Sequence, residues 1–221
     1  MASVKGRRKF LGSISAAMVG SGLLVSSCAG HTDHGQKERS EKKSGQAPGN
    51  KIAENKRMPR DLVMKMLDQK ADRYMHISFN CAQSSFLALK EQFGLPGDDI
   101  LKALTPLTGI AERGETCGAV TGALMIFGLL YGRGKTRLSD WDAYRASLVP
   151  SGEFCDRFEQ KYGSTMCCKI QEKRFGRCFR LTRSEDLKEF QAEGATDKCT
   201  VVVQDAVRLA ADIILDNKDT A

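Results

Sequence analysis

The chain has 221 residues, of which 41% are hydrophobic and 28% charged, and its formal net charge is +7. Residues 1–27 carry four basic and no acidic side chains, residues 28–60 carry eight basic and four acidic, and residues 61–221 carry 22 basic and 23 acidic. A nucleic-acid-binding domain concentrates its positive charge on the folded surface that meets phosphates. Because the excess here lies outside the part able to fold, we expect no nucleic-acid partner.

Residues 1–27 have the pattern of an export signal. A basic patch from Lys5 to Lys9 precedes a moderately apolar stretch rich in Ser and Gly. The string RRKFLG, with Arg7 and Arg8, resembles a twin-arginine signal, which exports proteins that have already folded. We therefore expect the protein on the periplasmic or extracytoplasmic face of the cytoplasmic membrane.

The string VSSC, which ends at Cys28, resembles a bacterial lipobox, in which the cysteine receives lipid. Ordinary cleavage near Ala29 is the alternative. Residues 28–57 contain almost no large apolar side chain, so they are predicted to be a polar tether. Together these features predict attachment to a membrane surface through Cys28, with the basic tether near anionic lipid head groups.

Residues 58–217 are predicted to form one all-α domain, an irregular bundle of about six helices. Apolar residues recur every three to four positions in several segments, and no strand-like alternation is present. The expected elements are helices at 59–77, 81–93 (capped by Asn80), 98–104 and 117–132, a helix from Ser139 to Tyr162 broken at Pro150, a turn at 167–171, a short helix at 185–191, and a last helix at 197–215 capped by Thr196.

Three of the eight cysteines occupy predicted helix starts: Cys81, Cys117 and Cys199. The N-terminus of a helix carries partial positive charge, which lowers the pKa of a cysteine there and favours thiolate. Thiolate is both the nucleophile and the metal ligand. With Cys28 set aside seven cysteines remain, an odd number, so they cannot all pair in disulfides.

The other cysteines allow several interpretations. Cys155 lies on an apolar stripe with Phe154 and Phe158, so we expect it to pack as a small hydrophobic residue. Cys178 is either a free thiol or a disulfide partner. Of the adjacent Cys167 and Cys168, only one is expected to face inward, unless the two form a vicinal disulfide.

Four segments together resemble a bacterial redox-active family named C_GCAxxG_C_C after these features. They are NCAQ with Cys81, ETCGAVTGALMIFGLLYG with Cys117, YGSTMC with Cys167, and KCTVVVQDAVRLAADII with Cys199. The haem-containing split-Soret cytochromes include a similar domain, and this resemblance implies that the four cysteines hold an iron-sulfur centre. In the family name Gly precedes Cys, whereas here Cys117 precedes Gly118.

Four separated cysteines suit a [2Fe–2S] cluster, a tetrahedral zinc ion or two redox-active disulfides. Export of a folded protein fits a cofactor inserted in the cytoplasm, so an iron-sulfur centre that exchanges electrons with a redox partner protein is favoured. The alternatives are a zinc-binding or disulfide-stabilised non-catalytic module, and a dithiol/disulfide oxidoreductase. The folded part has a single histidine, His76, and the chain has no C-x-x-C-H motif for covalent haem.

Gly118 and Gly122 are four residues apart, so they fall on nearly the same face of the helix predicted at 117–132. Because glycine has no side chain, this face is predicted to let another backbone approach the helix closely, beside Cys117.

Overall fold

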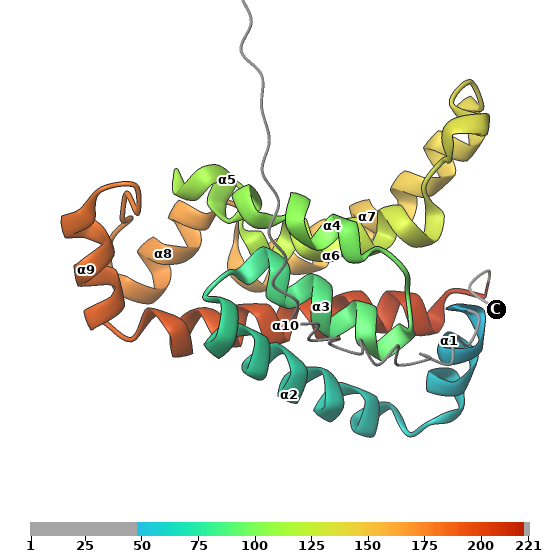
Figure 1. Cartoon of the computed structure of the whole chain (residues 1–221), viewed down its shortest axis with the longest axis horizontal. Helices are drawn as coiled ribbons and strands as arrows, with labels where there is room; N and C mark the ends of the chain where they lie inside the picture. The colour runs from blue at the N-terminus through green and yellow to red at the C-terminus, as the bar shows by residue number, and fades with distance from the viewer. Residues whose placement is uncertain (1–47, 219–221) are drawn as a thin grey trace, which may run out of the picture. The chain divides into compact units, whose positions relative to one another are not determined.

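The computed structural model describes residues 48–218, and within that range the chain is all-α (Figure 1). Ten α-helices and two short 3-10 turns, η1 (Thr105–Leu107) and η2 (Lys135–Arg137), follow one another. The helices are α1 (Pro48–Arg57), α2 (Arg60–Ser78), α3 (Cys81–Phe93), α4 (Asp98–Ala103), α5 (Gly109–Glu112), α6 (Gly118–Tyr131), α7 (Trp141–Tyr162), α8 (Cys167–Phe175), α9 (Ser184–Ala192) and α10 (Ala195–Asp216). The predicted fold class is confirmed, but about six helices was too few, because α1, α5 and α8 were not expected.

Helix α1 corrects the predicted extent of the tether. Ile52 and Asn55 are only 3% and 4% exposed. The Asn55 side chain donates a hydrogen bond of 3.0 Å to the carbonyl of Gln92 on α3, which satisfies a buried amide. Residues 48–57 therefore belong to the folded domain. The predicted signal at 1–27 and Cys28 lie outside the described residues.

Helix α3 lies at the centre of the core and contacts α2, α6 and α10. Each of these helices places an apolar face against its neighbours, and burying one such side chain contributes about 1.5–3 kcal/mol. The large side chains that are completely buried include Val63, Leu67, Phe86, Phe93, Ile126, Phe127 and Ile214.

Helix α7 continues through Pro150, where the sequence predicted a break. Proline removes one backbone donor and disfavours a helix interior. Pro150 is nevertheless buried, and it shares a buried stripe with Phe154, Phe158 and Tyr162. Packing of this stripe against the core outweighs the local preference of proline, so the helix stays continuous.

Helix α6 is the apolar run of the ETCGAVTGALMIFGLLYG segment, and it has 14 residues. A bilayer span needs about 20 apolar residues. Throughout residues 48–218, no helix is long and apolar enough to cross a membrane. The buried side chains of α6, such as Ile126 and Phe127, make it a core helix that holds Cys117 at its N-terminus.

Candidate four-cysteine redox site

The four cysteines come from four different helices. Cys81 is the first residue of α3, Cys117 is the N-cap of α6, and Cys167 is the first residue of α8. Cys199 lies one turn inside α10, because that helix begins at Ala195 and not at the predicted position 197. Three of the four thus lie at helix N-termini, but Cys167 takes the place that the sequence predicted for Cys199.

A cavity of about 480 Å³ brings three of these thiols together. It is lined by Cys81, Cys167 and Cys199 and by residues from α2, α5, α8, α9 and α10, namely Met75, Phe79, Thr108, Gly109, Glu112, Gly114, Gln171, Leu181, Leu187, Phe190, Gln191, Ala195 and Thr196. Cys117 is buried, at 6% exposure, and its thiol is hydrogen-bonded to that of Cys81. The cavity wall therefore carries three thiols with the fourth directly behind them.

The segments before α6 and α8 run side by side and fix two of the cysteines relative to each other. The backbone N–H of Cys117 donates to the carbonyl of Thr165 at 2.9 Å, and that of Cys167 donates to Glu115 at 2.7 Å. Thr116 and Met166 form an antiparallel bridge between these bonds. The bridge sets Cys117 and Cys167 beside each other although they are far apart in the sequence.

Cys81 is positioned by the cap of α3. The Asn80 side-chain oxygen accepts hydrogen bonds from the backbone N–H groups of Ala82 at 3.1 Å and Gln83 at 3.0 Å. Its amide nitrogen donates to the carbonyl of Thr105 at 3.1 Å. The predicted cap is confirmed, and it ties the start of α3 to the η1 segment that leads into the cavity wall.

Two glycines of α6 let α3 approach closely, as their spacing predicted. A Cβ on Gly118 would lie less than 3.0 Å from the Cys81 sulfur and 2.7 Å from the backbone nitrogen of Ala82. A Cβ on Gly122 would lie less than 3.0 Å from the Ala82 carbonyl oxygen and the Ser85 hydroxyl. The small residues thus bring the N-termini of α3 and α6, with their cysteines, into contact.

Cys117 and Cys81 share a hydrogen bond that shifts the pKa values of the two thiols in opposite directions. The pKa of the Cys117 thiol is lowered, first by the bond it accepts from Cys81 and then by the N–H groups of Ala119 and Val120. The pKa of the Cys81 thiol is raised well above its usual value, first because it donates this bond, then because of burial and the nearby thiolate charges. The hydrogen bond therefore makes Cys117 the more acidic thiol of the pair.

Burial dominates the acidity of the other two cysteines. It raises the pKa of Cys167, and the charge of Cys117 raises it further, while a hydrogen bond from Gln171 at 3.4 Å opposes this. The pKa of Cys199 is raised to about 12, again first by burial and then by Cys117. The sequence predicted lowered pKa values at the helix starts, and this is true only of Cys117, since burial and mutual repulsion outweigh the helix charge elsewhere.

A left-handed turn forms part of the cavity wall. Gly109, Ile110, Ala111 and Glu112 have successive φ angles of 52°, 44°, 55° and 61°. Left-handed backbone costs an L-amino acid about 1–2 kcal/mol per residue, and such strain clusters at functional sites. The sequence indicated only a glycine-containing loop here. The flanking Gly109 and Gly114 were the one available signal of unusual backbone.

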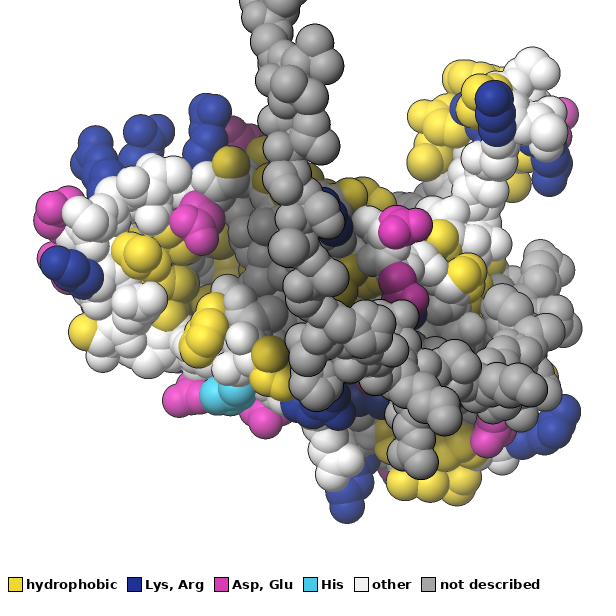
Figure 2. Space-filling view, viewed as in Figure 1, with side chains coloured by type: hydrophobic (Ala, Val, Ile, Leu, Met, Phe, Trp, Pro, Cys, Tyr) yellow, Lys and Arg dark blue, Asp and Glu magenta, His cyan; other side chains and the backbone are white. Residues whose placement is uncertain are grey.

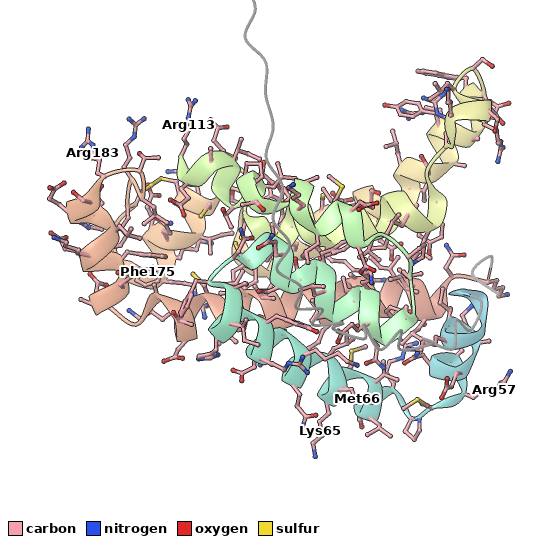
Figure 3. The ribbon with its side chains drawn as sticks, in the orientation of Figure 1. Arg57, Lys65, Met66, Arg113, Phe175 and Arg183 are labelled. Atoms are coloured by element: carbon pink, nitrogen blue, oxygen red, sulfur yellow. A yellow bond between two sulfur atoms is a disulfide. The ribbon has the colours of Figure 1, made fainter. Side chains whose placement is uncertain are left out.

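Three further cysteines lie outside the group of four. Cys168 and Cys178 form a disulfide with a Cα–Cα distance of 4.9 Å, visible as a yellow bond in Figure 3. This resolves the open alternatives for Cys178 and shows that Cys167 is the member of its adjacent pair on the cavity. Cys155 is free, half-buried and packed against the core, in agreement with its predicted role as a small hydrophobic residue.

His76 takes no part in the cavity. Its ring is exposed, with one nitrogen 2.9 Å from the Asp72 carbonyl oxygen and the other 3.2 Å from an Asp197 carboxylate oxygen. Within residues 48–218, no three or more His, Cys, Asp or Glu side chains are arranged as the ligands of one metal ion. The chemistry that the described residues bring to the site is that of thiols.

The comparisons with known proteins identify a family. The sequence model of the family described as "Putative redox-active protein (C_GCAxxG_C_C)" matches residues 79–213, which include all four cysteines of the site. No curated protein and no solved structure matches the chain. The match covers more than half of the chain, and the protein therefore belongs to the C_GCAxxG_C_C family of redox-active proteins.

Proposed function

We propose that the protein is an exported electron carrier in which Cys81, Cys117, Cys167 and Cys199 hold an iron-sulfur centre. The observation that supports this most strongly is the convergence of the four thiols: three of them, on Cys81, Cys167 and Cys199, line one cavity of about 480 Å³, and the fourth, Cys117, is hydrogen-bonded to Cys81. Membership of a family described as redox-active supports an electron-transfer role.

The donor set fits an iron-sulfur centre. Four cysteine thiolates are the usual ligands of [2Fe–2S] and [4Fe–4S] clusters. In the described residues, Cys117 is the one thiol of the four whose pKa is lowered, and repulsion among the thiolates helps to raise the pKa of the other three. A positive iron core would offset that repulsion and stabilise all four as thiolates.

When bound, such a centre supplies one-electron oxidation and reduction. The chain holds Cys81, Cys117 and Cys167 at the starts of helices. The positions of these helices are fixed by the Asn80 cap, the Thr116–Met166 bridge and the close contact of α3 with α6. Ligands held this firmly move little when charge changes. The apolar lining, which includes Met75 and Phe190, limits the access of water to the thiols.

A dithiol/disulfide oxidoreductase is the second candidate, and one observation favours it. In the hydrogen-bonded pair of Cys81 and Cys117, the lowered pKa of Cys117 favours the thiolate, which is the attacking species in disulfide exchange. Zinc bound by the four cysteines in a non-catalytic module is the third candidate. It is less well supported, because in residues 48–218 no three such side chains surround one ion position, and the size of the cavity suits a larger centre.

Export and membrane attachment are part of the proposal and rest on the sequence. RRKFLG supports twin-arginine export of a protein that has folded around its cofactor, and VSSC supports lipidation of Cys28. Cys28→Ser should release the protein from the membrane fraction. Replacing Arg7 and Arg8 with lysine should leave it in the cytoplasm. If both variants are distributed as the wild type, this part of the proposal is wrong.

Absorption spectra of protein purified without air test the proposed centre. We expect visible absorption that bleaches with dithionite, and we expect Cys117→Ser and Cys199→Ser to lose it. The matched control, Cys155→Ser, should keep it, because Cys155 lies outside the cavity. Far-ultraviolet circular dichroism checks that each variant folds. A colourless protein with one zinc ion per chain would contradict the proposal. Without metal, a gain of four thiols on reduction, two more than the Cys168–Cys178 disulfide supplies, would support the oxidoreductase.

A further inference from the structure

We propose that a basic surface beside the cavity docks an acidic face of a one-electron redox protein. We call this surface the basic collar, and it consists of Arg113, which directly follows α5, with Lys169, Lys173, Arg177, Arg180 and Arg183. The inference rests on the proposed electron-transfer function and adds the chemistry of the partner surface.

Positive charge is concentrated in one short segment. Residues 167–183 carry six basic side chains and a single acidic one, Glu172, whereas residues 61–221 as a whole carry 22 basic and 23 acidic. The collar is therefore a local feature of a domain that is otherwise slightly acidic. Figure 2 shows Lys and Arg side chains along the upper left edge of the molecule, where α5 and the segment before α9 lie in Figure 1.

Part of this charge is paired within the domain, since Lys169 contacts Glu172 and Arg177 contacts two carboxylates of α9, and in the described part of the chain much of the rest is not. Lys173, Arg180 and Arg183 are exposed, and among the described residues no carboxylate forms an ion pair with them. Arg113 has only a distant pairing with Glu115, at 3.9 Å. Exposed charges of one sign raise the local concentration of an oppositely charged partner and its rate of association.

The collar adjoins the proposed redox site. Its segment begins at Cys167, which lines the cavity, and Gln171 and Leu181 of the same segment line it too. The Cys168–Cys178 disulfide links the start of this segment to a position ten residues further along. The labelled Arg113 and Arg183 point away from the domain on the same side in Figure 3, although they come from different elements.

Two exposed apolar side chains lie next to the collar. Ile110 is 37% exposed and Met166 is 38% exposed. They rise from adjoining backbone, since a Cβ on Gly109 would lie 3.5 Å from the Cβ of Cys167. The left-handed turn places Ile110, a β-branched residue, at the surface. The backbone strain at this position is therefore not offset by burial of the side chain in the core. Apolar side chains within a charged rim are the usual anatomy of a protein interface.

The docked complex would hold the four cysteines near the partner, so a centre bound by them could exchange one electron with the partner's redox centre, one being oxidised as the other is reduced. No covalent bond would form or break. A lipid surface also attracts basic residues, but it accepts no electron. The exposed apolar side chains of Ile110 and Met166 beside the collar suit a protein interface, so a protein partner is favoured.

Binding of full-length protein to a defined probe tests the docking surface. The probe is a small acidic plant-type [2Fe–2S] ferredoxin, and a basic cytochrome c serves as the negative probe. The test variant combines Lys173→Glu, Arg180→Glu and Arg183→Glu. The control combines Lys65→Glu, Lys102→Glu and Lys135→Glu, which are also exposed, carry no ion pair among the described residues, and change the net charge equally.

Charge complementarity predicts that the collar variant binds ferredoxin at least about 10-fold more weakly than the wild type, with a smaller effect of salt. The control should change affinity by less than about 2-fold, because it lies away from the collar. Equal losses in both variants, or no binding of ferredoxin by the wild type, would overturn the proposal. The proposal would also be overturned if the collar variant lost binding to phosphatidylglycerol vesicles but bound ferredoxin as the wild type does. Ferredoxin binding can be measured whether or not the protein contains iron. A colourless protein that still binds ferredoxin would therefore contradict the proposed function and leave the docking proposal standing.

Discussion

Adding one methyl group to α6 tests how the two helices that carry Cys81 and Cys117 are held together. Gly118→Ala places a Cβ less than 3.0 Å from the Cys81 sulfur and 2.7 Å from the Ala82 nitrogen. The sulfur can rotate away, but only by leaving its place on the cavity. The backbone nitrogen can move only if α3 shifts. The variant should therefore perturb the site as well as the fold.

The expected loss follows from two opposing effects. Overpacking of this kind costs about 1–3 kcal/mol. Replacing glycine by alanine in a helix returns about 0.5–1 kcal/mol. We expect Gly118→Ala to lower the free energy of unfolding by about 1–2 kcal/mol, and Gly122→Ala by about 3 kcal/mol because its Cβ meets a backbone carbonyl.

Gly128→Ala is the matched control in the same helix, since nothing lies within 4 Å of its Cβ position. It should raise the free energy of unfolding by about 0.5–1 kcal/mol. Urea denaturation followed by circular dichroism measures all three variants. Equal stability changes at positions 118, 122 and 128 would refute the close-packing argument.

Three other perturbations test separate features. Ala111→Gly should stabilise the fold by about 0.5–1 kcal/mol, because glycine relieves left-handed backbone; a destabilised variant in urea would show that the turn carries no such strain. Cys178→Ala should cost about 3 kcal/mol by opening the short loop closed with Cys168, and reducing agent should then no longer lower its unfolding midpoint, in contrast to the wild type. Burial and a hydrogen bond to Glu91 raise the pKa of Tyr74 to about 12. Because the folded state keeps the proton to higher pH than the unfolded state, the free energy of unfolding should fall as the pH rises from the ordinary pKa of 10.0 to that value. Tyr74→Phe should reduce this pH dependence, and an unchanged dependence would show that it does not come from Tyr74.

The fold class and the close contact of α6 were predictable because they depend on local patterns. Three-to-four spacing of apolar residues specifies helices, and two glycines one turn apart specify a face without side chains. Helix α1 was missed because its core contact is carried by Ile52 and Asn55, too few apolar residues to mark a helix. The continuity of α7 through Pro150 depends on tertiary packing, which local preference does not contain.

The sequence singled out four cysteines that the structure brings together, but it did not predict their acidities. Cys81 and Cys117 lie at helix starts as expected, yet their acidities are set by each other and by burial, which only the folded arrangement determines. Likewise, the pairing of Cys168 with Cys178 and the left-handed turn at 109–112 depend on which segments meet in space. Spacing along the chain carries no such information.

Iron and acid-labile sulfide per chain, measured on protein purified without air, test the central claim most directly. The proposed centre predicts iron and sulfide in equal amounts in the wild type and in Cys155→Ser, and neither in Cys199→Ser. Wild-type protein that is folded, free of iron and sulfide, and unchanged in metal content by Cys199→Ser would contradict it.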